Sequence, residues 1–270
     1  MSAQVAYDKA KAEGRAALVG YLPAGFPSFE GSIDALKAMV EAGCDVIEIG
    51  LPYTDPMMDG PTIQDAVHQA LVGGIKVADV FRTVEAVAAT GVPTLVMTYW
   101  NPVDHYGVEA FARDLKSAGG AGLITPDLTP EEAGPWLEAA DAHDLDKVFL
   151  VALSSTDERI EKITQACRGF VYAASLMGVT GARTAVDTGA PRLVRRTRET
   201  IERRGLSLPV GLGLGVGNGA QAAEVAGFAD GVIVGSAFIR RLLDAPDPAA
   251  GLAGVRALAA ELAEGVRKGG

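Results

Sequence analysis

Short, strongly apolar runs alternate with longer amphipathic segments along nearly the whole chain, and this alternation limits the fold more than any other feature. The short runs contain few polar residues, which is typical of parallel strands covered on both faces. They predict eight strands, namely Ala17–Leu22, Val46–Gly50, Thr94–Thr98, Gly122–Thr125, Val148–Leu153, Phe170–Ala174, Leu208–Gly213 and Gly231–Val234. Between them, as in residues 77–88 and 252–262, apolar side chains recur with the period of a helix.

Eight βα units in 270 residues predict an α/β protein with a (β/α)8 TIM barrel as one domain spanning residues 1–270. A doubly wound sheet is the alternative. The longest separations follow the second and the sixth predicted strand, so we expect extended loops there. Because barrels build their active sites from loops at the carboxyl ends of the strands, these two loops are the places to search for chemistry.

The charge of the chain excludes several classes of partner. Its formal net charge is −10, which disfavours binding to nucleic acid or to an anionic membrane surface. The basic cluster from Arg192 to Arg204 is interrupted by Glu199 and Glu202 and predicts a solvated helix face. Two cysteines, no signal-peptide pattern and no window of about 18 apolar residues predict a soluble, cytoplasmic protein.

One carboxylate interrupts the second predicted strand. Side chains alternate along a strand, so Glu48 faces opposite to Ile47 and Ile49. If the isoleucines pack under the helices, Glu48 points into the barrel, where burial should raise its pKa above the usual value of about 4.3. Such a group suits general acid–base catalysis near neutral pH. A structural glutamate paired with an arginine or lysine is the alternative.

The loop after this strand carries two more acids, Asp55 and Asp59, among three prolines. The pair Asp59-Gly60 is a turn signal. Either acid is a candidate second carboxylate. Capping of the helix that is predicted to begin near Thr62 fits each of them equally well.

Glycines gather at the ends of the last two predicted strands. They alternate along residues 209–217, and Gly235-Ser236 precedes a helical run. Glycine lets backbone N–H groups approach an anion, and the positive end of a helix favours phosphate. Barrels frequently place a phosphate site after strands seven and eight. Tight turns are the alternative explanation for these glycines.

Residues 47–64, IEIGLPYTDPMMDGPTIQ, closely resemble the signature of the tryptophan synthase α subunit family. MTYWNP at residues 97–102 and YAASLMGVTG at residues 172–181 match it as well, and the resemblance covers essentially the whole chain. It implies retro-aldol cleavage of indole-3-glycerol phosphate to indole and glyceraldehyde 3-phosphate. It also implies that the α chain needs no cofactor.

The resemblance implies roles for individual residues. Glu48 would be the general acid and base, and Asp59 would accept a hydrogen bond from the indole N1–H as positive charge develops there. Tyr172 matches a tyrosine that supports proton handling, although a core tyrosine is the alternative. The implied phosphate contacts come from Gly181, Gly213, Gly235 and Ser236.

The indole pocket should be mostly apolar, because indole is flat and apolar. Tyr21, Leu153 and Ile233 are candidates by strand position, and Tyr21 also matches the family. Residues 178–187 are long enough to form a lid that excludes water. Within them, Thr180 corresponds to the family residue that hydrogen-bonds the equivalent of Asp59 on closure.

The family works as an αββα complex in which indole passes to a pyridoxal-phosphate β subunit. Asp55, Pro56 and Asn101 would face that β subunit. The chain departs from the commoner family pattern at four positions that leave both carboxylates intact, namely Tyr21, Trp100, Leu176 and Gly215.

Other readings are less well supported by the sequence. The three histidines lack metal-ligand spacing, so we expect no metal site. An indole-glycerol-phosphate synthase would need a lysine at a strand end, and an epimerase would need metal ligands or paired aspartates; neither is found. The alternative function of a different class is that of an activator: a catalytically weak barrel that mainly activates its β subunit. Intact Glu48 and Asp59 argue against it.

Overall fold

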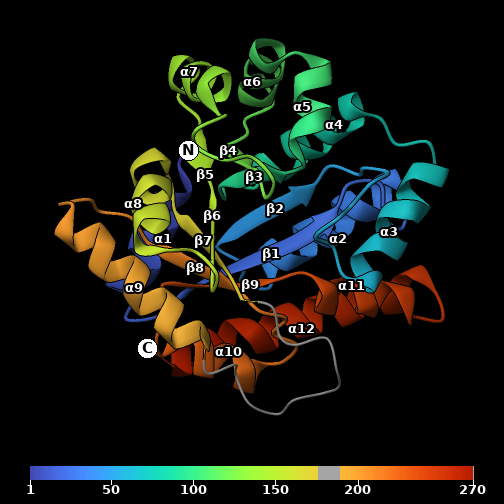
Figure 1. Ribbon diagram of the computed structural model, residues 1–270. Coiled ribbons are helices and arrows are strands. Elements are labelled where there is room, and N and C mark those ends of the chain that lie inside the picture. Colours follow the sequence, from blue (N-terminus) through green and yellow to red (C-terminus); the bar gives the residue numbers. More distant parts are fainter. Residues whose placement is uncertain (176–188, 270) are drawn as a thin grey trace.

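The computed structural model describes residues 1–175 and 189–269 and confirms the TIM barrel (Figure 1). Nine parallel strands form one sheet in the order β5-β4-β3-β2-β1-β9-β8-β7-β6, with the helices packed around it. The strands are β1 (Ala17–Pro23), β2 (Val46–Gly50), β3 (Thr94–Met97), β4 (Gly122–Ile124), β5 (Asp146–Val148), β6 (Leu150–Ala152), β7 (Val171–Ala174), β8 (Val210–Gly213) and β9 (Gly231–Val234).

Helices follow the strands along the chain, as the periodicity predicts. Those in the described residues are α1 (Ala3–Ala12), α2 (Phe29–Glu41), α3 (Pro61–Val72), α4 (Val77–Ala88), α5 (Trp100–Tyr106), α6 (Val108–Ser117), α7 (Gly134–Ala142), α8 (Asp157–Ala166), α9 (Gly189–Arg203), α10 (Gly219–Ala226), α11 (Ser236–Leu243) and α12 (Pro248–Lys268). None of the described helices is long and apolar enough to cross a membrane.

The strand predicted over residues 148–153 is in fact two, β5 and β6, with the buried Phe149 between them. Strand β5 pairs only with β4, and β6 pairs only with β7, so the two pieces are the ends of the sheet. The barrel is therefore nearly closed, and its seam runs between two strands that are consecutive in the chain.

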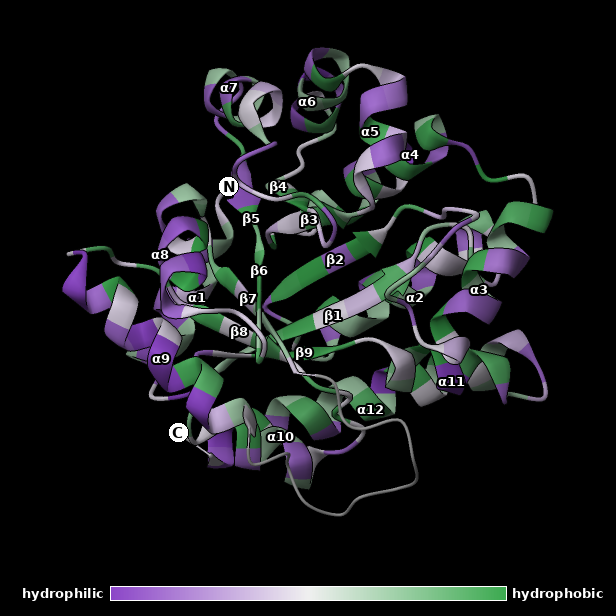
Figure 2. Cartoon of the chain, in the orientation of Figure 1, coloured by the Kyte–Doolittle hydropathy of each residue, from purple (hydrophilic) through white to green (hydrophobic). Residues whose placement is uncertain are grey.

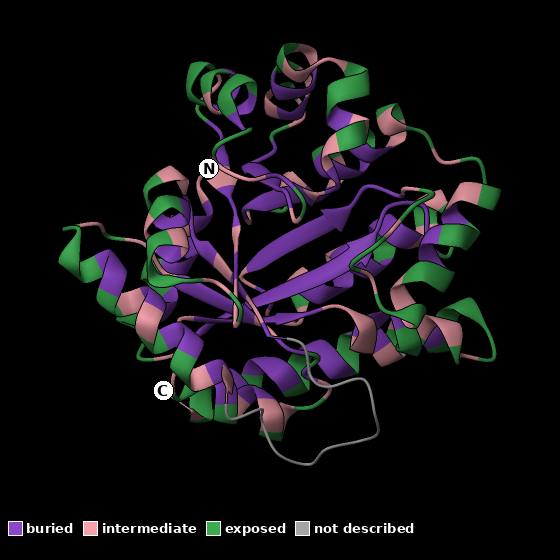
Figure 3. Cartoon of the chain, viewed as in Figure 1, coloured by how far each residue is buried: buried purple, intermediate pink, exposed green. Residues whose placement is uncertain are grey.

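The sheet separates two apolar clusters. The larger one lies between the outward strand side chains and the helices, and the smaller one fills the barrel interior. Ile47 and Ile49 belong to the outer cluster, as the alternation predicts, so Glu48 faces the interior. The strands are apolar and buried, whereas the outer faces of the helices are polar and exposed (Figures 2 and 3).

Helix α1 covers the amino-terminal end of the barrel. Its first residue, Ala3, donates its N–H to the buried carboxylate of Asp146 on β5 (2.7 Å), and the Ser2 hydroxyl donates to the same carboxylate (2.9 and 3.0 Å). One turn later, the Tyr7 ring stacks on Phe170, with 5.3 Å between the ring centroids. Helix α1 thereby places a buried tyrosine in the floor of the interior.

The two long connections differ in what the structure shows of them. The one after β2 consists of loop residues 51–60 followed by an additional helix, α3, before α4. Its length therefore comes mainly from a helix, not from an extended loop. The connection after β7 is residues 175–188, of which 176–188 lie outside the described residues together with the predicted lid, Leu176, Thr180 and Gly181.

Candidate active site

Glu48 lies in the middle of β2 and is fully buried in the barrel interior. It is in register with Tyr21 on β1 and Leu95 on β3. Neither of its carboxylate oxygens has a hydrogen-bond partner among the described residues, and no described arginine or lysine forms an ion pair with it. Burial without a compensating charge raises the pKa of Glu48 to about 8. The alternative of a structural ion pair therefore has no support in the described chain.

A cavity of about 140 Å³ opens above Glu48 at the carboxyl ends of the strands. It contains eight of the residues that the sequence singled out as site residues. The lining consists of Tyr21, Glu48, Asp59, Ile63, Met97, Tyr172, Gly213, Leu214, Gly215, Ile233, Gly235 and Ser236. Two carboxyl groups, two phenol groups and an apolar wall thus share one small space.

Asp59 reaches this cavity from the loop after β2. The loop is held by the Met58 N–H, which donates to the Tyr99 hydroxyl (2.9 Å), and by the Gln64 side-chain amide, which donates to the Asp59 carbonyl (2.7 Å). Burial raises the pKa of Asp59 to about 6. Gly60 is the N-cap of α3, and no side chain caps this helix end, so Asp59 does not have the capping role that the sequence left open.

The tyrosines occupy space that glycines leave free. A Cβ on Gly213 would lie 2.5 Å from the Tyr172 hydroxyl, and a Cβ on Gly235 would lie 3.0 Å from Cδ1 of Tyr21. A side chain on Gly50 would overlap the Tyr21 hydroxyl. These glycines therefore do more than allow turns. They leave room for the phenol rings of Tyr21 and Tyr172 in the cavity that Glu48 also lines.

Tyr172 is the second residue of β7, is half-buried and lines the cavity. Burial, together with the nearby Glu48 and Asp59 carboxyl groups, raises its pKa well above the usual value for a phenol. The hydroxyl therefore keeps its proton at neutral pH. It is available as a hydrogen-bond donor in the cavity, as its predicted supporting role requires.

A second, adjoining cavity of about 340 Å³ extends from this site toward α3 and α11. Helix α11 begins at Ser236, and its Gly235 N-cap makes no side-chain hydrogen bond. Gly215 has φ +85°, a conformation that favours glycine. The first-turn N–H groups of α11 and the glycine backbones of β8 thus border one recess, as expected for an anion site.

Sequence reasoning missed Arg240, which lines this recess. The residue lies four positions after Ser236, and residues i and i+4 share one face of a helix. That spacing was a signal that could have found it. Met97 and Ile63 were also missed. Met97 follows the inward-facing Leu95 by two positions on β3, so the strand alternation predicts that it points into the barrel.

Four predicted residues lie outside the central cavity. Leu153 follows the end of β6 and packs near Gly189 at the start of α9. It does not line the cavity, so the prediction that it belongs to the indole pocket is wrong. Asp55 and Asn101 are exposed and Pro56 is half-buried. The last three belong to the loop after β2 and to the start of α5, which follows β3, so they lie beyond the carboxyl ends of neighbouring strands.

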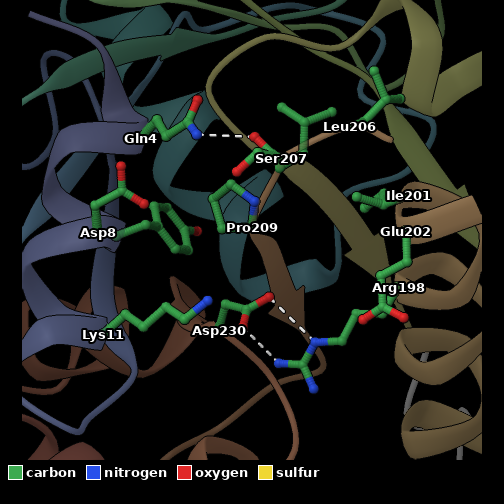
Figure 4. Close-up of a pocket in the computed structure, with 12 residues that line it drawn as sticks. Gln4, Asp8, Lys11, Arg198, Ile201, Glu202, Leu206, Ser207, Pro209 and Asp230 are labelled. Carbon is green, nitrogen blue, oxygen red and sulfur yellow. Dashed lines mark hydrogen bonds and ion pairs between the residues drawn. The ribbon is translucent and has the colours of Figure 1, made fainter. Parts of the chain in front are cut away.

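A groove lies at the opposite end of the barrel, between α1 and α9, and several of its lining residues form hydrogen bonds and ion pairs with one another (Figure 4). Arg198 pairs with Asp230 (2.6 Å), which also accepts the Val210 N–H (2.8 Å). The Gln4 amide donates to the Ser207 carbonyl (2.9 Å). These contacts attach α1 and α9 to the barrel. Arg198, one member of the basic cluster, is thus used within the fold.

The described residues contain no group of three histidine, cysteine, aspartate or glutamate side chains that could hold a metal ion. The cavity lining itself offers the chemistry of two carboxyl groups and two phenol groups. A TIM barrel with carboxyl groups of raised pKa at the carboxyl ends of its strands has the architecture of an acid–base enzyme.

Comparison with known proteins identifies the family. The family model described as tryptophan synthase alpha chain matches residues 7–267. A tryptophan synthase alpha chain from Salinispora arenicola is 66% identical over 263 residues, 97% of each chain. One from Streptomyces coelicolor is 63% identical over 259 residues, 96% of this chain and 94% of the relative. A tryptophan synthase structure from Mycobacterium tuberculosis superimposes with a TM-score of 0.90 at 54% identity, covering 98% of both chains. The chain belongs to the tryptophan synthase alpha chain family.

Proposed function

We propose that this chain cleaves indole-3-glycerol phosphate into indole and D-glyceraldehyde 3-phosphate, as one barrel domain acting in the cytoplasm. The observation that carries the proposal is the pair of carboxyl groups at one cavity, with Glu48 raised to a pKa of about 8 and Asp59 to about 6. At neutral pH the first is mostly protonated and the second mostly ionised. Two carboxyl groups with separated pKa values can divide acid and base roles between them.

The proposed reaction moves one proton to the substrate and one away from it. Protonated Glu48 delivers its proton to C3 of the indole, which places positive charge on the ring nitrogen. Asp59, as carboxylate, accepts a hydrogen bond from N1–H and stabilises that charge where it develops. Ionised Glu48 then takes the proton of the glycerol hydroxyl next to the breaking bond. The electrons of the carbon–carbon bond return to the indole ring, and Glu48 is protonated again.

The rest of the cavity suits the two parts of the substrate. Tyr21, Met97 and Ile233 supply an apolar wall for indole, and Tyr172 supports proton handling next to Glu48. The proposed phosphate contacts within the described residues are Gly213, Gly235 and Ser236. We propose that Gly181 and Thr180, which lie outside the described residues, complete the site. All of these steps use groups of the chain itself and require no cofactor.

We also propose that indole passes to a tryptophan synthase β subunit in an αββα complex. Asp55, Pro56 and Asn101, beyond the strand ends at this face, are the proposed contacts. An assay of glyceraldehyde 3-phosphate release tests the proposed cleavage with wild type, Glu48→Gln and Asp59→Asn, each with and without the β subunit. We expect each variant to lose at least about 10²-fold in rate. If the wild-type chain releases no glyceraldehyde 3-phosphate even with its β subunit, yet raises the activity of the β subunit, the chain is only an activator.

A further inference from the structure

Arg240 stands at the recess where the phosphate is proposed to bind. It lines the recess together with Gly213, Gly215 and Ser236, and no other charged side chain of the described residues contributes to that lining. Its guanidinium makes no hydrogen bond or ion pair with any described residue, although most arginines of the chain are paired. An exposed and unengaged cation therefore borders the positive end of α11.

The cavity that adjoins Arg240 is surrounded by negative charge, which a positive side chain at the recess can offset. The chain carries a formal net charge of −10, and Glu48 and Asp59 both line the adjoining cavity. A phosphomonoester that enters with a charge near −2 is repelled by Asp59 whenever that carboxyl is ionised. The backbone N–H groups and the end of α11 offer only partial positive charge, about half an elementary charge for a helix end. A full positive charge at the recess offsets the repulsion.

The neighbouring arginine does not share this position. A Cβ on Gly254 of α12 would lie 3.5 Å from Cβ and 3.6 Å from Cδ of Arg241, so the Arg241 side chain runs along α12 and away from the recess. Arg241 has the same charge, the same helix and similar exposure, but does not line the recess. It is thus a matched control for any effect of Arg240 that depends on location.

We propose that Arg240 recognises the dianionic phosphate of the substrate and sets the preference of this site for phosphomonoesters over the corresponding alcohols. The proposal rests on the function proposed above and adds a charged group to a phosphate site otherwise built from backbone N–H groups and a serine. Arg240 contributes to binding and not to the proton transfers, because it lies on the α11 side of the recess and does not line the cavity that holds Glu48.

Arg240→Gln, Arg240→Lys and Arg241→Gln test the proposal by steady-state kinetics on indole-3-glycerol phosphate. For Arg240→Gln we expect KM to rise about 10-fold with kcat within about 2-fold of wild type, the scale of one charge-assisted contact. Arg240→Lys should recover part of the loss, and Arg241→Gln should behave as wild type. An unchanged KM in Arg240→Gln, or equal losses in both glutamine variants, would overturn the proposal.

Calorimetric titration with glycerol 3-phosphate, inorganic phosphate and glycerol separates this inference from the proposed reaction. Wild type should bind glycerol 3-phosphate, with an affinity that falls as KCl is raised, and Arg240→Gln should bind it more weakly with a smaller dependence on salt. That result in a wild type without lyase activity would uphold phosphate recognition and reject the reaction. Active enzyme with equal phosphate affinity in wild type and Arg240→Gln would reject the role of Arg240 alone.

Discussion

The hydroxyl of Tyr172 occupies the space next to Gly213, where a Cβ would lie only 2.5 Å from it. Gly213→Ala should therefore displace the phenol without removing the Gly213 N–H. We expect a loss in kcat of at least about 10-fold with little change in global stability, because the nearest atoms belong to a side chain that can move. Steady-state kinetics and urea unfolding of the variant check this.

The double variant Gly213→Ala/Tyr172→Phe provides the control. Removing the hydroxyl relieves the shortest contact, although Cε1 and Cζ of the ring remain 3.0 Å from the new methyl group. The two substitutions should therefore be less than additive in a double-mutant cycle. Fully additive losses would show that Gly213 and Tyr172 act independently, with the glycine needed only for its backbone.

The dependence of activity on pH should follow the two carboxyl groups. Asp59 must be ionised and Glu48 protonated at the start of the proposed reaction, so kcat/KM should rise through about pH 6 and fall through about pH 8. Asp59→Asn should leave low residual activity without the acidic limb that Asp59 causes. The second ionisation of the substrate phosphate, also near pH 6, would remain. An alkaline limb that persists unchanged in Glu48→Gln would contradict the assignment of Glu48.

Glu48 should also make stability depend on pH. Its pKa is about 8 in the folded protein against 4.5 ordinarily, so between these values the folded state holds a proton that the unfolded chain has released. The contribution of Glu48 to stability is therefore fully present below about pH 4.5, and this contribution is lost as the pH rises to about 8. The loss is up to about 5 kcal/mol. Urea unfolding at pH 5 and pH 9 should show a smaller difference for Glu48→Gln than for wild type; equal differences would refute the raised pKa.

Asp146 should be essential for attaching α1. Its buried carboxylate accepts from the Ala3 N–H and the Ser2 hydroxyl, so Asp146→Ala leaves the start of α1 without its partner on β5. We expect a loss of about 2–3 kcal/mol in the free energy of unfolding. Ser2→Ala, which leaves the carboxylate and the Ala3 N–H in place, should cost about 1 kcal/mol. A similar loss for both variants would mean that the serine alone holds the helix.

Tyr7→Phe should keep or increase stability. The Tyr7 hydroxyl is buried without a hydrogen-bond partner among the described residues, next to the backbone of Gly211 and Gly231. A buried, unpaired hydroxyl costs free energy, so its removal should change stability by between zero and about +1 kcal/mol while the ring remains stacked on Phe170. Thermal unfolding measures this, and a clear loss of stability would show that the hydroxyl has a partner.

Much of the fold could be predicted because the strands and helices follow local rules. Alternation along residues 46–50 correctly placed Glu48 inside the barrel and the isoleucines outside it. The break at Phe149 could not be seen, because residues 148–153 form one uninterrupted apolar run and the break depends on how the sheet closes. For the same reason Leu153, placed by strand position, lies beyond the end of β6 and outside the cavity.

The sequence predicted eight residues that line the cavity, but it could not predict all of their surroundings. Glu48 and Asp59 are close in sequence and were found together, but whether Glu48 meets a cation depends on elements far away in the chain. The sequence could not decide whether Asp59 caps α3 or lines the cavity, because a shift of the helix start by one residue changes the answer. In the structure Gly60 is the N-cap. Arg240 could not be predicted from the glycines at the strand ends, because it lies one helical turn beyond Ser236.

The seam between β5 and β6 bears on how the barrel is assembled during synthesis. Strands β1 to β5 are made first and form one continuous half of the sheet, and β6 to β9 form the other half later. The halves come into parallel register along β1 and β9, where Ala17–Gly20 meet Gly231–Val234. The first strand to leave the ribosome must therefore wait for the last one, with an unpaired edge exposed for most of translation.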